Sequence, residues 1–263
     1  MDLGLKGKKA LVTGSSRGLG YATALGLSQE GCVVTINSRN LEKIQSVERK
    51  LSAQTGSIVK SIGADITHPG SPDKIVSKAA NMMDGLDILV TNSAGPPSGA
   101  FESFNDDDWQ NSIELNFLSH MRLIRAALPF LKKSSAASVL TITSMSVKQP
   151  VPNLILSNSV RSATVGLTKS LSLELSNLGI RFNSILPGWT ETERVQELMA
   201  YRAQANQTTI EEETAKQALD SPFNRLASPQ EFANVAVFLV SPAASYLTGT
   251  MLAVDGGMYK ATY

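Results

Sequence analysis

Near its start the chain carries the glycine-rich segment Thr13-Gly14-Ser15-Ser16-Arg17-Gly18-Leu19-Gly20. It follows a short apolar run and opens a helical pattern, so its three glycines fall at the turn from strand to helix. Glycine there permits a tight turn, and the free N–H groups and dipole at the helix start favour a pyrophosphate. Such glycines also occur in ordinary turns, but their place in the first βα unit favours a dinucleotide site. The candidate cofactor-binding residues here are Gly14, Ser16, Arg17, Gly18, Leu19 and Gly20.

Outward from this turn, short apolar runs alternate with stretches of helical periodicity. The runs that predict strands are Ala10 to Val12, Val33 to Ile36, Ile58 to Ile62, Ile88 to Val90, Val139 to Ile142, Ile180 to Ile185 and Met251 to Val254. Repeated βα units bury parallel strands on both faces and require right-handed crossovers. We therefore predict an α/β fold, a doubly wound (Rossmann-type) parallel sheet of about seven strands with helices on both faces.

The whole chain, residues 1–263, is expected to form a single domain, because no internal repeat, proline-rich linker or change in composition marks a boundary. One long polar region runs from Thr190 to Arg225, with helical patterns around Val195 to Arg202 and Glu211 to Leu219. Insertions of this size in α/β proteins usually cover a binding site. Residues 190–225 are therefore predicted to be a substrate lid.

The second predicted strand ends in Asn37-Ser38-Arg39, where an NAD-binding protein would place a carboxylate against the ribose hydroxyls. A carboxylate would repel a ribose 2′-phosphate, whereas Ser38 can hydrogen-bond to it and Arg39 and Arg17 can pair with it. The alternative is that both arginines are solvated surface charges. Their joint placement favours the phosphorylated cofactor, and we predict NADP(H).

The bulk composition excludes several classes of partner. Lys and Arg number 24 and Asp and Glu 23, so no long-range positive field would hold nucleic acid or an anionic membrane. No apolar run approaches the ~20 residues that span a bilayer, and Met1 to Lys9 has no apolar signal region. The single cysteine, Cys32, is expected to be a core residue and fits a reducing compartment. We expect a cytoplasmic protein with no metal, nucleic-acid or membrane partner.

Further motifs along the whole chain, together with the glycine turn, resemble the short-chain dehydrogenase/reductase family. The resemblance implies further cofactor-binding residues, namely Asp65 and Ile66 beside the adenine, Asn92, Ala94 and Gly95 after the fourth strand, Pro187 and Gly188 beside the nicotinamide, and Thr192 at a phosphate. Asn116 matches a helix asparagine, Ser144 the catalytic serine, and Asp255-Gly256-Gly257 the C-terminal signature. Gly95-Pro96-Pro97 and Ser157-Asn158 also resemble a divergent branch near the 3-oxoacyl-(acyl carrier protein) reductases.

The pattern departs from the family at two positions. Aligned on Gly166 to Leu171, the chain has Ser157 and Arg161 where the family has the tyrosine and lysine of Tyr-x-x-x-Lys. In the family, the tyrosine exchanges a proton with the substrate, and the lysine lowers the tyrosine pKa and holds the nicotinamide ribose. Arg161 can hold the ribose but cannot exchange a proton near neutrality. Ser157 is too weak an acid to replace the phenol, whose loss typically removes ~10² to 10⁴ in rate.

Other titratable residues are weak candidates for the proton source. Tyr201 lies in the predicted lid, whereas amphipathic packing explains Tyr21 and Tyr246. His68 and His120 titrate near neutrality but have no obvious path to a substrate.

The surviving side chains favour a water-mediated route. In this hypothesis Ser144 orients the carbonyl oxygen by a hydrogen bond, and a water held by Asn116 and Arg161 delivers the proton. The candidate catalytic residues are therefore Asn116, Ser144, Ser157 and Arg161.

Two classes of function stay open. The first is an NADP(H)-dependent oxidoreductase for a small-molecule carbonyl or alcohol, with a 3-oxoacyl-type substrate suggested by the family branch alone. The second is a non-catalytic NADP(H)-binding sensor or assembly subunit, which the loss of Tyr and Lys favours. The stretch from Arg225 through Gly257 resembles the family segment that builds subunit contacts, so a homodimer or homotetramer is expected.

Overall fold

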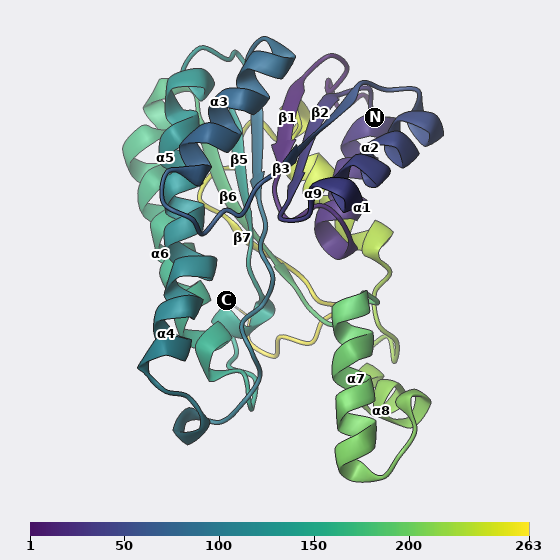
Figure 1. Cartoon of the computed structure of the whole chain (residues 1–263). Helices are drawn as coiled ribbons and strands as arrows, with labels where there is room; N and C mark the ends of the chain where they lie inside the picture. Colours follow the sequence, from purple (N-terminus) through teal and green to yellow (C-terminus); the bar gives the residue numbers. More distant parts are fainter. Residues whose placement is uncertain (263) are drawn as a thin grey trace.

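Within residues 1–262, the part of the chain that the structure describes, seven parallel strands form one sheet in the order β3-β2-β1-β4-β5-β6-β7 (Figure 1). This computed structural model confirms the predicted doubly wound, Rossmann-type fold. The strands are β1 (Lys9–Val12), β2 (Val33–Ser38), β3 (Val59–Gly63), β4 (Ile88–Thr91), β5 (Ser138–Ile142), β6 (Arg181–Pro187) and β7 (Met251–Val254). The strand order reverses between β1 and β4, the point at which ligands bind in such sheets.

Strand limits follow burial and pairing. Ile58, the first residue of the predicted third strand, is 59% exposed, and β3 begins instead at Val59, which pairs with Val34. At their other ends, β2 and β6 run beyond the predicted limits to Ser38 and Pro187, because both residues still pair with a neighbouring strand. These extensions bring both residues to the carboxyl edge of the sheet.

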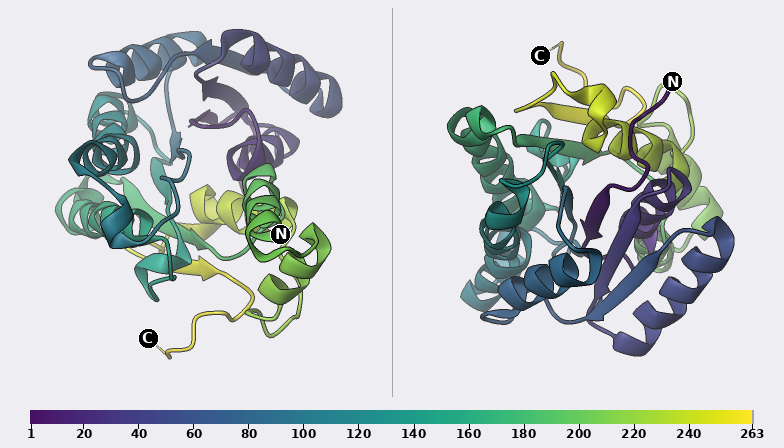
Figure 2. Two further views of the ribbon diagram at one scale, coloured as in Figure 1. Left: turned by 60° about the horizontal axis from the view of Figure 1, so that its bottom comes forward. Right: turned by 90° about the horizontal axis from the view of Figure 1, so that it is seen from above.

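Helices cover both faces of the sheet, as predicted (Figures 1 and 2). On one face lie α1 (Gly18–Gln29), α2 (Leu41–Thr55) and α9 (Pro229–Val240), and on the other α3 (Ser71–Met83), α4 (Asp106–Ile113), α5 (Ser119–Leu131) and α6 (Ile155–Leu175). Among residues 1–262, no helix combines the length and apolar character needed to cross a membrane.

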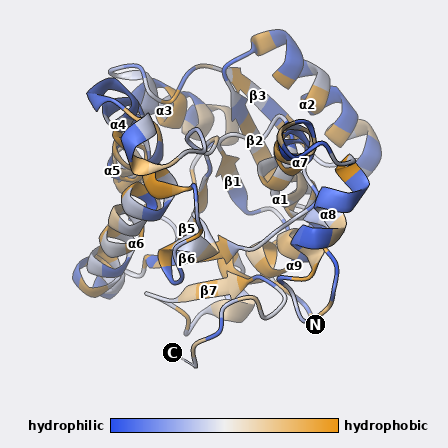
Figure 3. Cartoon of the chain, turned by 90° about the horizontal axis from the view of Figure 1, so that it is seen from below, coloured by the Kyte–Doolittle hydropathy of each residue, from blue (hydrophilic) through white to orange (hydrophobic). Residues whose placement is uncertain are grey.

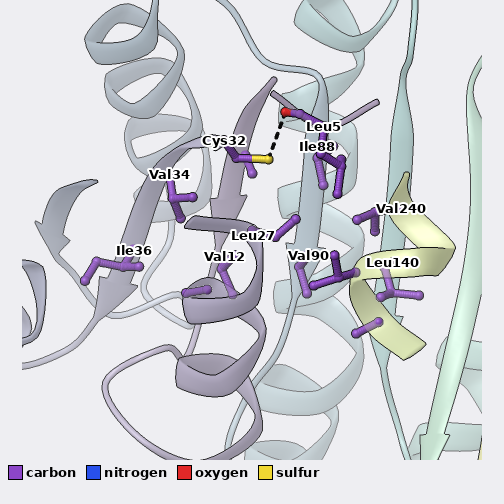
Figure 4. Close-up of a cluster of buried hydrophobic side chains, with 14 of the residues drawn as sticks. Leu5, Val12, Leu27, Cys32, Val34, Ile36, Ile88, Val90, Leu140 and Val240 are labelled. Atoms are coloured by element: carbon purple, nitrogen blue, oxygen red, sulfur yellow. Dashed lines mark hydrogen bonds between the residues drawn. The ribbon is translucent and has the colours of Figure 1, made fainter. Parts of the chain in front are cut away.

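The strands bury apolar side chains on both faces. Figure 4 shows one cluster, in which Val12 and Val90 of the central strands meet Leu27 of α1 and Val240 of α9. Cys32 lies in this cluster, 1% exposed, and its thiol donates to the carbonyl oxygen of Leu5 at 3.3 Å. Burial, followed by the charge of Asp87, raises the pKa of Cys32 to about 12, so the cysteine is a protonated core residue as expected.

Residues 190–225 contain two helices, α7 (Glu193–Asn206) and α8 (Ile210–Ala218), at the two predicted helical patterns. Seen from below, they stand on the α1 and α9 side of the molecule, opposite α4 to α6, and at the carboxyl ends of the strands (Figure 3). Thr192 caps α7, since its hydroxyl accepts a hydrogen bond from the backbone N–H of Val195 at 3.4 Å.

Only one of the two tyrosines that were expected to pack against the core does so. Tyr21 packs partly buried against the core, with Nζ of Lys50 5.1 Å from its ring centroid. The expectation for Tyr246 is wrong, because its side chain is fully exposed. It follows the short helical turn Pro242–Ala244 in a surface connection, where no neighbouring layer covers it.

Candidate active site

A cavity of about 670 Å³ opens at the carboxyl edge of the sheet. Its wall includes most of the predicted site residues, namely Gly14, Ser16, Arg17, Gly18, Leu19, Ser38, Arg39, Asp65, Ile66, Asn92, Ala94, Gly95, Ser144, Ser157, Arg161, Pro187, Gly188 and Thr192. Gly20 and Asn116 lie behind this wall. Residues from both halves of the sheet therefore line the same cavity.

The glycine turn leaves no room for side chains. Gly14 and Gly18 both have a φ of +58°, which L side chains rarely adopt. A Cβ atom on Gly14 would stand 2.7 Å from the carbonyl oxygen of Asn92, and one on Gly20 2.5 Å from that of Gly14. The amide of Asn92 donates to the Gly14 carbonyl at 2.9 Å, so the first and fourth strand ends are joined at this turn. Gly20 thus permits close packing inside the turn.

Helix α1 presents free backbone donors to the cavity. Arg17 is its N-cap residue, and no side chain of the described residues caps the helix there. The N–H groups of the first turn therefore stay available to an anion, and the helix dipole favours negative charge at this end.

Cationic side chains surround the opening near the end of β2. Arg39 lines the cavity beside Ser38, whose hydroxyl donates to the Asn40 carbonyl at 3.2 Å. Lys43, in the first turn of α2, also lines it. Sequence analysis missed Lys43. The signal that could have found it is its position only four residues after Arg39, close to the end of β2. Nη1 of Arg17 lies 2.9 Å from Oε1 of Glu197, so this arginine forms an ion pair with α7.

Asp65 is held in one orientation at the same end. Its Oδ1 accepts hydrogen bonds from the backbone N–H and the hydroxyl of Thr67, at 2.9 and 2.7 Å. Burial by itself would raise the pKa of Asp65, but these hydrogen bonds and the charge of Arg39 lower it. Asp65 is therefore ionised at neutral pH.

Asn116 sits in a π-helical turn, Glu114–Leu118, and its side chain is buried. Nδ2 donates to the hydroxyl of Ser93 and the carbonyl oxygen of Ala94, each at 2.8 Å. The backbone carbonyl of Asn116 accepts from the hydroxyl of Thr164 at 2.6 Å. Its Oδ1 is buried without a hydrogen-bond partner among residues 1–262. This oxygen is the acceptor left for a bound water.

His120 belongs to the same network and explains Ser93, where the family has a second asparagine. The Ser93 hydroxyl, which accepts from Asn116, also forms a hydrogen bond with Nε2 of His120 at 3.0 Å. Nδ1 of His120 forms a hydrogen bond with the Thr91 hydroxyl at 2.9 Å, so both ring nitrogens have a partner. Burial, with the charge of Arg161, lowers the pKa of His120 to about 3, so the ring is neutral and structural. His68 is exposed and does not line the cavity.

Ser144, Ser157 and Arg161 meet at the other end of the cavity. Ser144 follows β5 and its hydroxyl accepts from the backbone N–H of Ser146 at 3.1 Å. Ser157 and Arg161 are one helical turn apart on α6, 8% and 6% exposed. Nη1 of Arg161 donates to the carbonyl oxygens of Ile142 and Thr143, at 3.2 and 3.3 Å. Burial and the charge of Arg194 lower the pKa of Arg161 to about 10, which leaves it charged at neutral pH.

Two residues that follow β6 line the cavity although sequence analysis did not assign them to the site. Trp189 and Arg194 line the cavity, and Nη2 of Arg194 donates to the carbonyl oxygen of Pro96 at 2.9 Å. Arg194 comes two residues after Thr192, and this proximity is the only feature of the sequence that points to Arg194. Tyr201 is 69% exposed and is not part of the cavity wall, so the structure does not place it with Ser144.

Comparisons with known proteins agree with this geometry. A family model described as Enoyl-(Acyl carrier protein) reductase matches residues 14–259. Dehydrogenase/reductase SDR family member 4 from Sus scrofa is 33% identical over 257 residues, covering 96% of this chain and 88% of that protein. The 3-oxoacyl-[acyl-carrier-protein] reductase FabG of Aquifex aeolicus is 29% identical over 259 residues, covering 98% and 100%. L-sorbose reductase from Gluconobacter frateurii, solved with NADPH and L-sorbose, matches with a TM-score of 0.95 at 30% identity, covering 99% and 100%.

Fold and cavity together define a doubly wound α/β protein with a ligand site at the reversal of its strand order. The matches over nearly the whole chain narrow this class, and the chain belongs to the short-chain dehydrogenase/reductase family of NAD(P)-dependent oxidoreductases. The NADPH in the sorbose reductase complex is the cofactor that the sequence predicts for this chain.

Proposed function

We propose that this chain is an NADP(H)-dependent oxidoreductase that interconverts a carbonyl compound and its alcohol. One observation carries the proposal. A single cavity contains both the glycine turn, with the free N–H groups of α1, and a cluster of cationic side chains at the end of β2. Arg17, Arg39 and Lys43 supply positive charge there. Bound NADP(H) would supply or accept the hydride.

The residues present fit that cofactor. Gly14, Gly18 and Leu19 of the turn line the cavity, and the uncapped first turn of α1 offers N–H donors to a pyrophosphate there. Ser38 and Arg39 would hold the 2′-phosphate, and Arg161 the nicotinamide ribose. Thr192 would contact a phosphate, and Pro187 would lie beside the nicotinamide.

The proposed chemistry is atypical for the family, because Ser157 and Arg161 stand in place of its tyrosine and lysine. Ser144 would orient the carbonyl oxygen by a hydrogen bond. Hydride addition would leave an alkoxide, which would take a proton from a water between the unpartnered Oδ1 of Asn116 and the guanidinium of Arg161. The hydroxide left there would be reprotonated by solvent through the open cavity. Similarity to the Aquifex aeolicus reductase supports a 3-oxoacyl-type substrate.

Three broader expectations belong to the same proposal. Residues 1–263 would act as one domain, with residues 190–225 as a lid over the cavity, supported by the contacts of Arg17 and Arg194 across it. Exposed apolar side chains beside and on β7, Tyr246 and Leu252, support a homodimer or homotetramer. The one cysteine, buried and reduced, supports a cytoplasmic location.

A non-catalytic NADP(H)-binding sensor or assembly subunit is the second candidate. One observation favours it, which is that no tyrosine is among the described residues of the cavity wall. Binding and turnover separate the two candidates. Tight NADPH binding without oxidation by any compound of a broad carbonyl panel would support the sensor.

The test begins with calorimetric titration of the purified protein by NADPH and NADH. Charge-assisted hydrogen bonds to the 2′-phosphate should make NADPH bind at least ~10-fold more tightly. Oxidation of NADPH by the carbonyl panel is then followed at saturating cofactor. Ser144→Ala should cut the rate by ~10² or more, while Ser162→Ala, an exposed serine on α6, leaves it unchanged. A preference for NADH contradicts the cofactor assignment, and an unchanged rate in Ser144→Ala contradicts its role.

A further inference from the structure

Four buried polar residues connect the end of β4 with the π-helical turn and the start of α5. Oγ of Ser93 lies 2.8 Å from Nδ2 of Asn116 and 3.0 Å from Nε2 of His120. Nδ1 of His120 lies 2.9 Å from Oγ1 of Thr91, the last residue of β4. None of the four is more than 9% exposed, so water competes little for these hydrogen bonds.

Asn116 and His120 are four residues apart, one in the π-helical turn and the other in the first turn of α5. Residues at this spacing lie on the same side of a helix, and both side chains here contact Ser93. Ser93 also lines the cavity. The buried network therefore reaches the cavity wall through one hydroxyl.

These contacts fix the orientation of the Asn116 amide. The backbone carbonyl oxygen of Ala94 can only accept a hydrogen bond, so Nδ2 must face it. Ser93 accepts from Nδ2 as well, also at 2.8 Å. Rotation of the amide would break both hydrogen bonds. Oδ1 thus stays the atom without a partner among residues 1–262.

The Ser93 hydroxyl is held in turn by His120. A serine hydroxyl can adopt several directions, and a second partner is needed to select one of them. Nε2 of His120 is that partner, and Thr91 holds the other ring nitrogen against the end of β4. The order of dependence therefore runs from His120 through Ser93 to Asn116.

We propose that His120 and Ser93 are positioning residues for the proton-transfer step. They act through Asn116 by keeping its Oδ1 directed at the water that protonates the alkoxide. When Oδ1 accepts one O–H of this water, the other O–H is left for the alkoxide. A rotated amide would present an N–H instead and lose this arrangement. The inference rests on the proposed function, since the water belongs to the proposed reaction.

Two substitutions of His120 separate positioning from packing. Glutamine places a polar atom as many bonds from Cβ as Nε2 is, whereas asparagine places one where Nδ1 lies. His120→Gln can therefore keep the contact with Ser93, and His120→Asn only the contact with Thr91. Ser93→Ala removes the hydroxyl itself. Ser28→Ala, the same change at a buried serine of α1 outside the cavity wall, is the control.

The first measurements are kcat for NADPH oxidation by a carbonyl compound, its solvent deuterium isotope effect, and the Kd of NADPH. Ser93→Ala and His120→Asn should lower kcat ~3- to 10-fold, which corresponds to about one hydrogen bond, and enlarge the isotope effect. His120→Gln should restore most of both, and Ser28→Ala should match the wild type. The Kd of NADPH should change less than about twofold throughout. A merely structural role would lower the free energy of unfolding and leave the isotope effect unchanged.

A second measurement does not depend on turnover. NMR of asparagine-labelled protein follows hydrogen exchange at Nδ2 of Asn116, whose signal is assigned by its absence in Asn116→Ser. Exchange should be ~3- to 10-fold faster in Ser93→Ala and His120→Asn than in the wild type and His120→Gln. Equal exchange rates in all of them would overturn the positioning role.

The two measurements also distinguish this inference from the proposed function. The expected exchange rates in a protein that oxidises no NADPH would support the network and contradict the proposed reaction. Unchanged kcat and isotope effect in Ser93→Ala, with NADPH oxidised, would overturn the inference and leave the proposed function standing. Weaker NADPH binding at unchanged kcat would overturn it too, and would assign Ser93 to the cofactor.

Discussion

At the scale of single residues, the proposed function depends on a proton source other than the tyrosine and lysine expected from the family pattern. Ser157 and Arg161 are both buried at the cavity wall, one helical turn apart on α6. Neither side chain transfers a proton readily at neutral pH. The surrounding residues, including Ser144 and Asn116, are nevertheless arranged around the same cavity end.

The combined variant Ser157→Tyr with Arg161→Lys should therefore raise the rate of NADPH oxidation. A phenol with a lysine one turn away restores a positioned general acid, worth ~10² to 10⁴ in rate. The measurement is the single-turnover rate at saturating NADPH and carbonyl compound. Ser157→Tyr alone should give less, since no amine lowers the pKa of the new phenol. A slower double variant with intact NADPH binding would show that the native site uses another route.

A second prediction at this scale concerns His120 and the pH dependence of the free energy of unfolding. Burial of the ring, followed by the charge of Arg161, lowers the pKa of His120 in the folded protein from the ordinary 6.5 to about 3. Between these values the unfolded chain binds a proton that the folded chain does not. The stabilising contribution of neutral His120 is thus complete above pH 6.5 and is lost as the pH falls toward 3, by ~1.4 kcal/mol per pH unit.

Urea unfolding of the wild type and His120→Gln at pH 7 and pH 5 measures this effect. The wild type should lose about 2 kcal/mol more than the variant between the two pH values. His68→Gln, which changes the exposed histidine, should behave like the wild type. The same pH dependence in wild type and His120→Gln would contradict the assignment, as would an NMR titration of this imidazole near pH 6.5.

At the scale of elements, α7 is joined to the rest of the molecule across the cavity. Arg17 pairs with Glu197, Arg194 reaches the Pro96 carbonyl, and the Arg202 guanidinium carbon lies 5.6 Å from the Trp189 ring centroid. In the proposed function Arg17 also contributes positive charge to the site of the 2′-phosphate, so α7 and the cofactor would compete for Arg17.

Glu197→Gln should accordingly raise the affinity for NADPH. An exposed ion pair is worth at most ~1 kcal/mol, so the gain should be ~2- to 5-fold, with a smaller change for NADH. Calorimetric titration measures both constants. Glu211→Gln, the same change at an exposed position on α8, is the control. Weaker NADPH binding in Glu197→Gln would show that the ion pair supports the binding-competent position of α7.

At the scale of the whole molecule, one edge of the sheet carries exposed apolar side chains. β7 is an edge strand within residues 1–262, and beside and on it Tyr246 is fully exposed and Leu252 is 36% exposed. An uncovered edge with apolar residues favours association with another copy.

The double variant Tyr246→Asp with Leu252→Asp should weaken this association at least ~10-fold, because charges would be buried at the contact. Sedimentation velocity over a range of protein concentrations measures it. Tyr201→Asp, at an exposed tyrosine on α7, is the control and should leave the assembly unchanged. A monomeric wild type, or an unaffected double variant, would exclude this edge as the interface.

The sequence alone predicted the sheet, its strand positions and the glycine turn, because these depend on local periodicity and on backbone angles near each residue. The limits of β3 differ by one residue at Ile58, whose exposure depends on its neighbours in space. The buried position of Asn116 behind the wall and the pairing of Arg17 with Glu197 were not predictable in the same way. Both result from contacts between segments far apart in the chain.

The type of fold and the place along the chain where a dinucleotide site would form thus follow from the amino-acid sequence, since apolar spacing and glycines act locally. The tertiary structure alone decided which charges share the cavity. Lys43 joins Arg39 at one end, and Arg194 joins Arg161 at the other. The reason is physical, because the energy of a charge depends on its distance to other charges and to water, and only the folded chain sets those distances.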